Sequence, residues 1–182
     1  MLVERCAKFF TQNRVDDFTG DPHTSINGQP YQTTMGSNSK YTPRQILDAF
    51  YEAERIYMSS QPDQRDFTGI AATLAPDFRM EQTSALPYAG MYIGPSGMQD
   101  WASRMADYFE VVDVQDPEIF ESPGSDRIVV LSKVHFKVRG TGQEMDFPFC
   151  QAVTVDCEKG VMTEMRPFYW DVAAVNSALG LV

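Results

Sequence analysis

The chain has 182 residues and a formal net charge of −10; 43% of its residues are hydrophobic and 22% are charged. This composition is typical of a single globular domain with a sizeable core. The acidic balance, without a basic cluster, excludes nucleic acid as a partner, and no apolar run is long enough to span a membrane. Three cysteines without CxxC spacing argue against a disulfide framework or a zinc site. The N-terminal sequence lacks the long apolar core of a secretory signal, so we expect a cytoplasmic protein.

Residues 1–41 are expected to form a polar N-terminal arm. The stretch 19–41 is dense in Gly, Pro, Ser, Thr and Asn, a composition that cannot bury much apolar surface. His23 lies in this arm and is interpreted as a solvated histidine. The domain itself is expected to span 42–182, because Thr42 suits a helix N-cap and the proline after it suits the first helical position.

Two helices and a short strand are expected at the start of the domain. Apolar residues, with Glu54 in the same row, recur at helical spacing over 43–59. A second, short helix is expected over 67–74, where the Ala-Pro-Asp sequence at 75–77 would end it. A strand follows over 78–83, and its more apolar face carries Phe78, Met80 and Gln82.

A third helix and then a sheet are expected in the rest of the chain. After a loop, Pro95 and Ser96 open a helix with an apolar stripe of Met98, Trp101, Ala102, Met105 and Phe109. Strands rich in β-branched and aromatic residues start near Val111 and include 127–138, 145–156 and 161–170. Asp171 is expected to cap a closing helix. This order indicates an α+β domain with helices on one side of an antiparallel sheet.

Three stretches carry a resemblance to a known family: LPYAGMYIGPSGMQDW, GTGQ and EKGVMTEMRPFYWD. With the order of elements, they resemble the SnoaL-like polyketide cyclases of the nuclear transport factor 2-like superfamily, whose relatives include ketosteroid isomerase, scytalone dehydratase and limonene-epoxide hydrolase. The resemblance covers roughly residues 42–180. It implies a cone-shaped, curved antiparallel sheet (a cystatin-like barrel) packed on about three helices, and a homodimer formed through the outer face of the sheet. No phosphate loop, nucleophile elbow or metal cluster is visible, so neither cofactor nor metal is expected.

The resemblance places candidate catalytic groups on two strands. Ketosteroid isomerase carries a general-base carboxylate near the position of Gln82; alternation favours Gln82 pointing inward, whereas a one-residue slip would bring in Glu81. Epoxide hydrolases carry an Arg and an Asp where Lys133 and His135 stand here. His135 has two interpretations that stay open. It is a pocket base, whose neutral form the lysines at 133 and 137 would favour, or it faces away from the core, because the alternate residues of its strand are the apolar ones.

The last strand departs from the pattern of the epoxide hydrolases, because Phe168 stands where they carry a catalytic acid. Epoxide hydrolysis is therefore not expected. Apolar and aromatic residues are instead expected to form a chamber for a hydrophobic ligand, with a few polar anchors. A plain filled core is the alternative explanation of the same pattern. The expected lining residues are Tyr57, Trp101, Met105, Phe109, Phe147, Phe149, Gln151 and Phe168.

The expected function is that of a cofactor-independent enzyme that cyclises, isomerises or dehydrates a hydrophobic, polyketide- or terpenoid-like metabolite by acid–base chemistry. His135 would be the acid or base, Gln82 or Glu81 its partner, and Lys133 or Gln151 the group that stabilises an enolate-like oxygen. The alternative is a non-catalytic protein of the same fold that binds a small ligand or another protein. The two differ in geometry: a closed cavity shared by His135 and Gln82 favours the enzyme, and an outer face favours the alternative.

Overall fold

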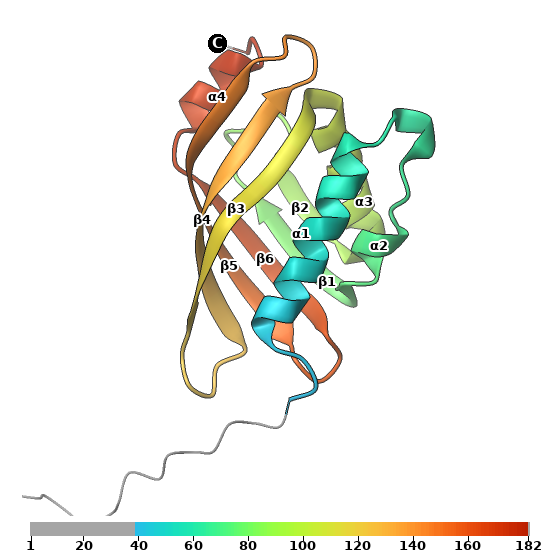
Figure 1. The fold of residues 1–182 in the computed structure, drawn as a ribbon, viewed down its shortest axis with the longest axis vertical. Coiled ribbons are helices and arrows are strands. Elements are labelled where there is room, and N and C mark those ends of the chain that lie inside the picture. The colour runs from blue at the N-terminus through green and yellow to red at the C-terminus, as the bar shows by residue number, and fades with distance from the viewer. Residues whose placement is uncertain (1–38, 182) are drawn as a thin grey trace, which may run out of the picture. The chain divides into compact units, whose positions relative to one another are not determined.

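The computed structural model describes residues 39–181, which form a curved six-stranded sheet with helices packed on one of its faces (Figure 1). The strands lie in the order β2-β1-β6-β5-β4-β3. Neighbouring strands are antiparallel except β1 and β6, which run parallel. The expected α+β class with a curved, mainly antiparallel sheet is confirmed. Most of the expected N-terminal arm, with His23, lies outside the described residues.

Helix α1 (Pro43–Ser59) begins where the sequence predicts. The Oγ1 of Thr42 accepts a hydrogen bond from the backbone N–H of Gln45 at 3.2 Å, and the Gln45 side chain accepts one from the N–H of Thr42 at 2.9 Å. This capping box, together with proline at the first helical position, fixes the start of the helix. One face of α1 is buried and consists of Ile46, Leu47, Phe50, Tyr51, Glu54, Tyr57 and Met58.

The segment after α1 is less helical than predicted. The helix expected over 67–74 is confined to the single turn of α2 (Thr68–Ala71), which follows a 3₁₀ turn, η1 (Pro62–Gln64). Strand β1 (Leu74–Gln82) already begins where that helix was expected to end. The prediction was wrong because the Ala-Pro-Asp sequence at 75–77, interpreted as a helix stop, lies inside the strand.

Strand β1 tolerates a proline because its pairing is irregular there. The register of β1 with β6 shifts between Leu74 and Arg79, so position 76 needs no place in a regular ladder. The carbonyl of Pro76 then restricts the start of the next helix. Gly94 has φ +67, and a Cβ at this position would lie 2.9 Å from the Pro76 oxygen. Glycine meets both the positive φ and the close approach.

A short strand, β2 (Gly90–Ile93), pairs antiparallel with β1 in the segment expected to be a loop. Four residues are too few to show a clear alternation, which explains the error. Helix α3 (Gly94–Tyr108) buries the predicted apolar stripe. Phe109, expected at the end of that stripe, is instead the first residue of β3 (Phe109–Glu121), where it is equally buried.

The remaining strands agree with the prediction to within one residue at each end. They are β4 (Arg127–Val138), β5 (Glu144–Asp156) and β6 (Val161–Tyr169). Helix α4 (Val172–Ala178) closes the described chain. Its predicted cap is confirmed, because Oδ1 of Asp171 accepts a hydrogen bond from the N–H of Ala174 at 2.8 Å.

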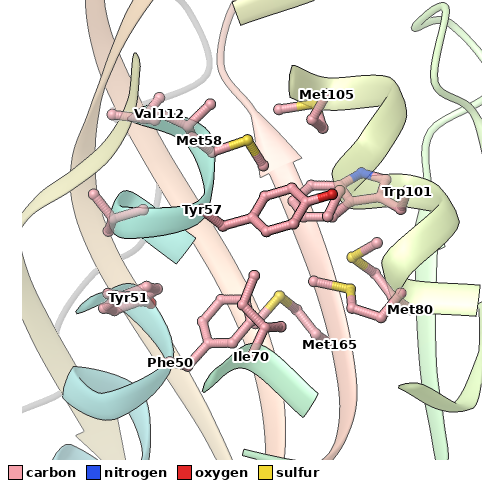
Figure 2. Packing of buried hydrophobic residues seen from close by; sticks show 14 of the residues in the cluster. Phe50, Tyr51, Tyr57, Met58, Ile70, Met80, Trp101, Met105, Val112 and Met165 are labelled. Atoms are coloured by element: carbon pink, nitrogen blue, oxygen red, sulfur yellow. The ribbon is translucent and has the colours of Figure 1, made fainter. Parts of the chain in front are cut away.

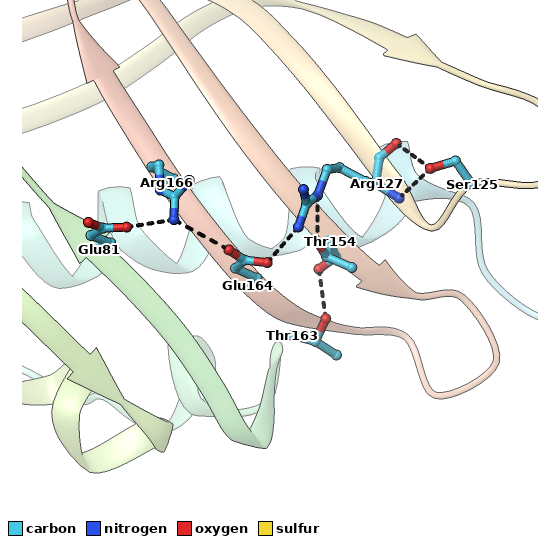
Figure 3. A network of polar contacts seen from close by, with 7 residues as sticks. All are labelled: Glu81, Ser125, Arg127, Thr154, Thr163, Glu164 and Arg166. Atoms are coloured by element: carbon cyan, nitrogen blue, oxygen red, sulfur yellow. Dashed lines mark hydrogen bonds and ion pairs between the residues drawn. The ribbon is translucent and has the colours of Figure 1, made fainter.

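Alternation along the strands gives the sheet an inner face, against α1 and α3, and an outer face. On β4, Val134, Phe136 and Val138 are buried on the inner face, and the residues between them point outward. The outer face carries a chain of exposed ion pairs that crosses the sheet from β1 to β4 (Figure 3). In this chain Arg166 pairs with both Glu81 and Glu164. Glu164 also pairs with Arg127 of β4.

Candidate functional site

A small cavity lies under the inner face of the sheet, between the strands and helices α1 and α3. It measures about 20 Å³, room for about one water molecule. Its wall is mainly apolar and includes Met80, Met105 and Met165, which are labelled in Figure 2. Four lining residues carry polar side-chain atoms: Glu54, Trp101, Gln151 and Tyr169.

Glu54 is the ionisable carboxylic acid of this cavity. It projects from the buried face of α1 and is only 5% exposed. Among the described residues its carboxyl group has no hydrogen bond or ion pair. Burial raises the pKa of Glu54 to about 8; Arg55 opposes this shift and Asp113 adds to it. At neutral pH the carboxyl group is therefore mainly in its neutral form, ready to give up a proton.

Gln151 is held in place by two neighbours. The Tyr51 hydroxyl donates a hydrogen bond to Oε1 of Gln151, and Nε2 of Gln151 lies 3.5 Å from the sulfur of Met165. Burial raises the pKa of Tyr51 well above its ordinary value, so the phenol stays a donor. Both ends of the Gln151 amide are thus engaged, and its side chain forms a fixed polar patch in the wall.

Tyr169 and Gln82 form a second buried polar pair. Nε2 of Gln82 donates to the Tyr169 hydroxyl over a long 3.4 Å, and burial raises the pKa of Tyr169 to about 12. Oε1 of Gln82 has no hydrogen-bond partner among the described residues. Gln82 does point inward, as alternation predicts, although it supports the cavity through Tyr169 and does not line it.

The family model of the SnoaL-like domain matches residues 48–165. The chain belongs to the SnoaL-like domain family. The matched span includes α1 from Asp48 onward, and so contains Glu54, as well as all of α3. No protein of the curated set matches the sequence at a significant level.

Several solved structures share the fold of this SnoaL-like domain. An NTF2-like protein of unknown function from Burkholderia pseudomallei is 22% identical, with a TM-score of 0.60 over 75% of this chain and 95% of that chain. TerC, co-crystallised with polyporic acid, is 19% identical, with a TM-score of 0.61 over 75% and 97%. A candidate polyketide cyclase from Xanthomonas campestris pv. campestris is 18% identical, with a TM-score of 0.57 over 74% and 93%. Identities this low show a common fold, which hosts many functions.

The structure brings together half of the lining residues that the sequence suggested. Trp101, Met105, Phe149 and Gln151 line the cavity of the SnoaL-like domain. Three others are buried in the core elsewhere: Tyr57, Phe109 and Phe147. Phe168 requires a correction, because it lies on the outer face and is 50% exposed. The strand alternates, so its neighbours Pro167 and Tyr169 face the cavity in its place.

Three of the four expected catalytic residues lie on the outer face. His135 points away from the core, and its Nδ1 lies 2.9 Å from Oδ1 of Asp146 on the neighbouring strand. Lys133 is exposed, and Glu81 forms an ion pair with Arg166 at 2.5 Å. Of the two interpretations of His135, the structure supports the one in which the side chain faces away from the core. Its buried strand neighbours, which are all apolar, require it.

Glu54 is the site residue that sequence reasoning missed. Its signal was present, because a glutamate occupied the apolar row of the first helix, where charged residues are rare unless paired. Within residues 39–181 no cluster of three His, Cys, Asp or Glu side chains could hold a metal ion. In the same part of the chain no helix is long and apolar enough to cross a membrane.

Proposed function

We propose that this SnoaL-like protein is a cofactor-independent enzyme that moves protons on a hydrophobic small metabolite in a cyclisation, isomerisation or dehydration. Glu54, and not His135, is the proton-transferring group. The observation that carries the proposal is a glutamic acid that is buried, unpaired among the described residues and placed in the wall of an apolar cavity. Perturbed acids in such cavities are typical of catalytic sites.

Because the pKa of Glu54 is raised, its carboxyl group can both take up and release a proton near neutral pH. As a carboxylate, it removes a proton from the carbon next to a carbonyl group, and the electron pair of that C–H bond moves to the carbonyl oxygen as an enolate. As the acid so formed, it returns the proton to carbon or oxygen. In a dehydration the acid so formed donates its proton to a hydroxyl group on the next carbon, which leaves as water while the electron pair of the enolate forms the new C=C bond. An acid with a pKa of about 8 is well matched to these roles.

The apolar wall supports a hydrophobic substrate. A metabolite larger than water needs wall side chains to move, and the cavity offers Met80, Met105 and Met165 for this purpose. Methionine side chains are unbranched and adapt to irregular shapes. A water-poor cavity also strengthens the interaction of the acid with developing charge on the substrate.

We also propose that the protein forms a homodimer through the outer face of the sheet. An outer apolar strip consists of Val129, Leu131, Cys150 and Phe168; Leu131 is in register with Cys150, and Cys150 with Phe168. Three of these side chains are 40–50% exposed. Charged residues lie on both sides of the strip, the ion-pair chain of Figure 3 on one and Lys133 on the other. An apolar centre with a polar rim is the pattern of a protein interface.

Deuterium exchange tests the proposed chemistry without knowledge of the natural substrate. A panel of hydrophobic ketones is incubated with the protein in D₂O, and loss of the protons next to the carbonyl group is followed by NMR. We expect exchange with at least one ketone and a loss of about 100-fold or more in Glu54→Gln. The matched control is Glu52→Gln, an exposed glutamate of the same helix. Equal rates for wild type and Glu54→Gln would show that Glu54 is not the catalytic group.

The alternative, a non-catalytic ligand-binding protein, is favoured by one observation. Among the described residues that line the cavity, Glu54 is the one carboxylic acid, and no histidine or lysine joins it. In that case ketones bind, as judged by a raised melting temperature, while no ketone of the panel exchanges its protons.

A further inference from the structure

Trp101 carries a buried hydrogen-bond donor without a partner. Its ring is 4% exposed, and its Nε1 forms no hydrogen bond with any described residue. Trp101 lines the cavity, and Figure 2 shows its ring projecting from α3 toward the side chains of α1. The indole N–H can only donate, so it needs an acceptor atom.

Among the described residues, none of the other polar side chains of the cavity wall accepts a hydrogen bond from the Trp101 N–H. Gln151 is engaged by Tyr51 and Met165, and the Tyr169 hydroxyl is engaged by Gln82. Within the described residues, two lining side chains with polar atoms make no hydrogen bond: Trp101 from α3 and Glu54 from α1.

An unmade bond of this kind is costly in a protein core. Leaving a buried donor unsatisfied costs about 1–3 kcal/mol, and native structures rarely contain one without a reason such as a bound molecule. Phenylalanine at position 101 would keep an aromatic ring without carrying an unpaired donor. The N–H therefore points to an acceptor atom that enters the cavity from outside the protein.

We propose that the Trp101 N–H is a specificity-determining donor for a carbonyl oxygen of the ligand. The cavity thus selects hydrophobic ketones and related carbonyl compounds over hydrocarbons of the same shape. Glu54, from the opposite helix, is the group that removes the proton from the carbon next to that carbonyl. The Trp101 N–H then stabilises the negative charge that develops on the oxygen when this proton leaves.

An isosteric ligand pair tests this role directly: cyclohexanone and methylenecyclohexane differ only in C=O against C=CH₂. The full chain contains two tryptophans, and Trp170 is exposed on the outer side, so ¹⁵N labelling of tryptophan gives two indole signals. Trp170→Phe assigns them. We expect cyclohexanone to move the Trp101 N–H signal downfield, with little change from methylenecyclohexane and none at Trp170. No downfield movement with cyclohexanone at its highest soluble concentration would overturn the proposal.

A second measurement uses Trp101→Phe, which keeps an aromatic ring and removes the donor. The preference for cyclohexanone over methylenecyclohexane, taken as the ratio of the two dissociation constants, should fall by about 3- to 10-fold, the loss of one hydrogen bond. An unchanged ratio contradicts the proposal. Comparing two ligands in one variant cancels general effects of the substitution on packing, and the NMR test on the unaltered ring stands even if the variant does not fold.

The inference deepens the proposed function, and the two fail in different ways. If Trp101 reports the ketone but no ketone exchanges its protons with deuterium, then the enzyme proposal fails and the recognition proposal stands. If exchange depends on Glu54 while the Trp101 signal stays unchanged with the ketone that exchanges, then the recognition proposal fails and the enzyme proposal stands.

Discussion

The inner cavity and the outer face of the sheet treat ionisable side chains in opposite ways. On the outer face, His135, Glu81 and Lys133 are solvated and each lies beside an opposite or complementary group. In the cavity, Glu54 is buried and has no hydrogen bond or ion pair with a described residue, and its pKa rises to about 8. Each of these three outer side chains has a partner of opposite or complementary charge, whereas Glu54 has none among the described residues. The contrast shows that burial away from water, more than residue type, gives a side chain an unusual pKa.

The sharpest way to break this comparison is to remove one group from each region. Glu54→Gln should lower the rate of deuterium exchange into a ketone by about 100-fold or more, because the amide can neither take up nor deliver the proton. His135→Ala should leave that rate within about twofold, since the ring points away from the cavity. Parallel rate measurements on both variants check this. A large loss in His135→Ala with an active Glu54→Gln would return catalysis to the outer face.

The second effect concerns stability. The pKa of Glu54 is about 8 in the folded protein and about 4.5 when the chain is unfolded. Between these values the folded protein holds a proton that the unfolded chain has released. The contribution of Glu54 to the free energy of unfolding is therefore complete below pH 4.5 and falls by about 1.4 kcal/mol per pH unit up to pH 8.

Urea unfolding at several pH values measures this slope. The difference in unfolding free energy between wild type and Glu54→Gln should decrease steadily from pH 4.5 to pH 8 and level off above it. Glu52→Gln, on the exposed side of α1, should show no such trend. A flat difference would mean that Glu54 is ionised in the folded protein, and the contrast between the two regions would disappear.

The fold was largely predictable from local patterns, for reasons that the helix start and the long strands make clear. The capping signal Thr42-Pro43 and the alternation of β4 to β6 act over neighbouring residues, so the sequence displays them directly. The errors occurred in segments whose secondary structure depends on contacts with residues far away in the sequence. Pro76 lies in a strand because its partner strand tolerates an irregular register. The four residues of β2 are a strand because β1 lies beside them.

The candidate site was harder to predict than the fold. Alternation favoured Gln82 inside, and the match to pocket positions of related enzymes placed Phe149 and Gln151 there. His135 stayed open, because resemblance to related enzymes and the apolar row of its strand indicated opposite directions. Glu54 was already recognised as a member of the apolar row of the first helix. Its importance depends on the lack of a partner, and this follows from what α3 and the sheet place opposite it. A single sequence does not contain that information.

A smaller effect is expected when a charge is placed on the outer face of the sheet. Leu131→Asp places a charge in the middle of the outer apolar strip, and we expect it to convert a dimer into a monomer, because a buried charge without a partner is unfavourable in an interface. Light scattering combined with size exclusion gives the mass. Ile56→Asp, at an exposed apolar position on α1, serves as the control and should stay dimeric. A monomeric wild-type protein would contradict the dimer proposal.

The smallest effect is expected for the ion-pair chain of Figure 3. Arg166 pairs with Glu81 at 2.5 Å and with Glu164 at 3.9 Å, and Glu164 pairs with Arg127 at 2.9 Å. All four side chains are well exposed, so Arg166→Ala should lower the free energy of unfolding by about 1 kcal/mol or less, and by still less at high salt. The measurement is best made in the Leu131→Asp background, where dimerisation does not add to the result. A loss larger than the whole change expected from Glu54 between pH 4.5 and pH 8 would mean that the outer charges, and not the isolated inner acid, dominate the electrostatics of this fold.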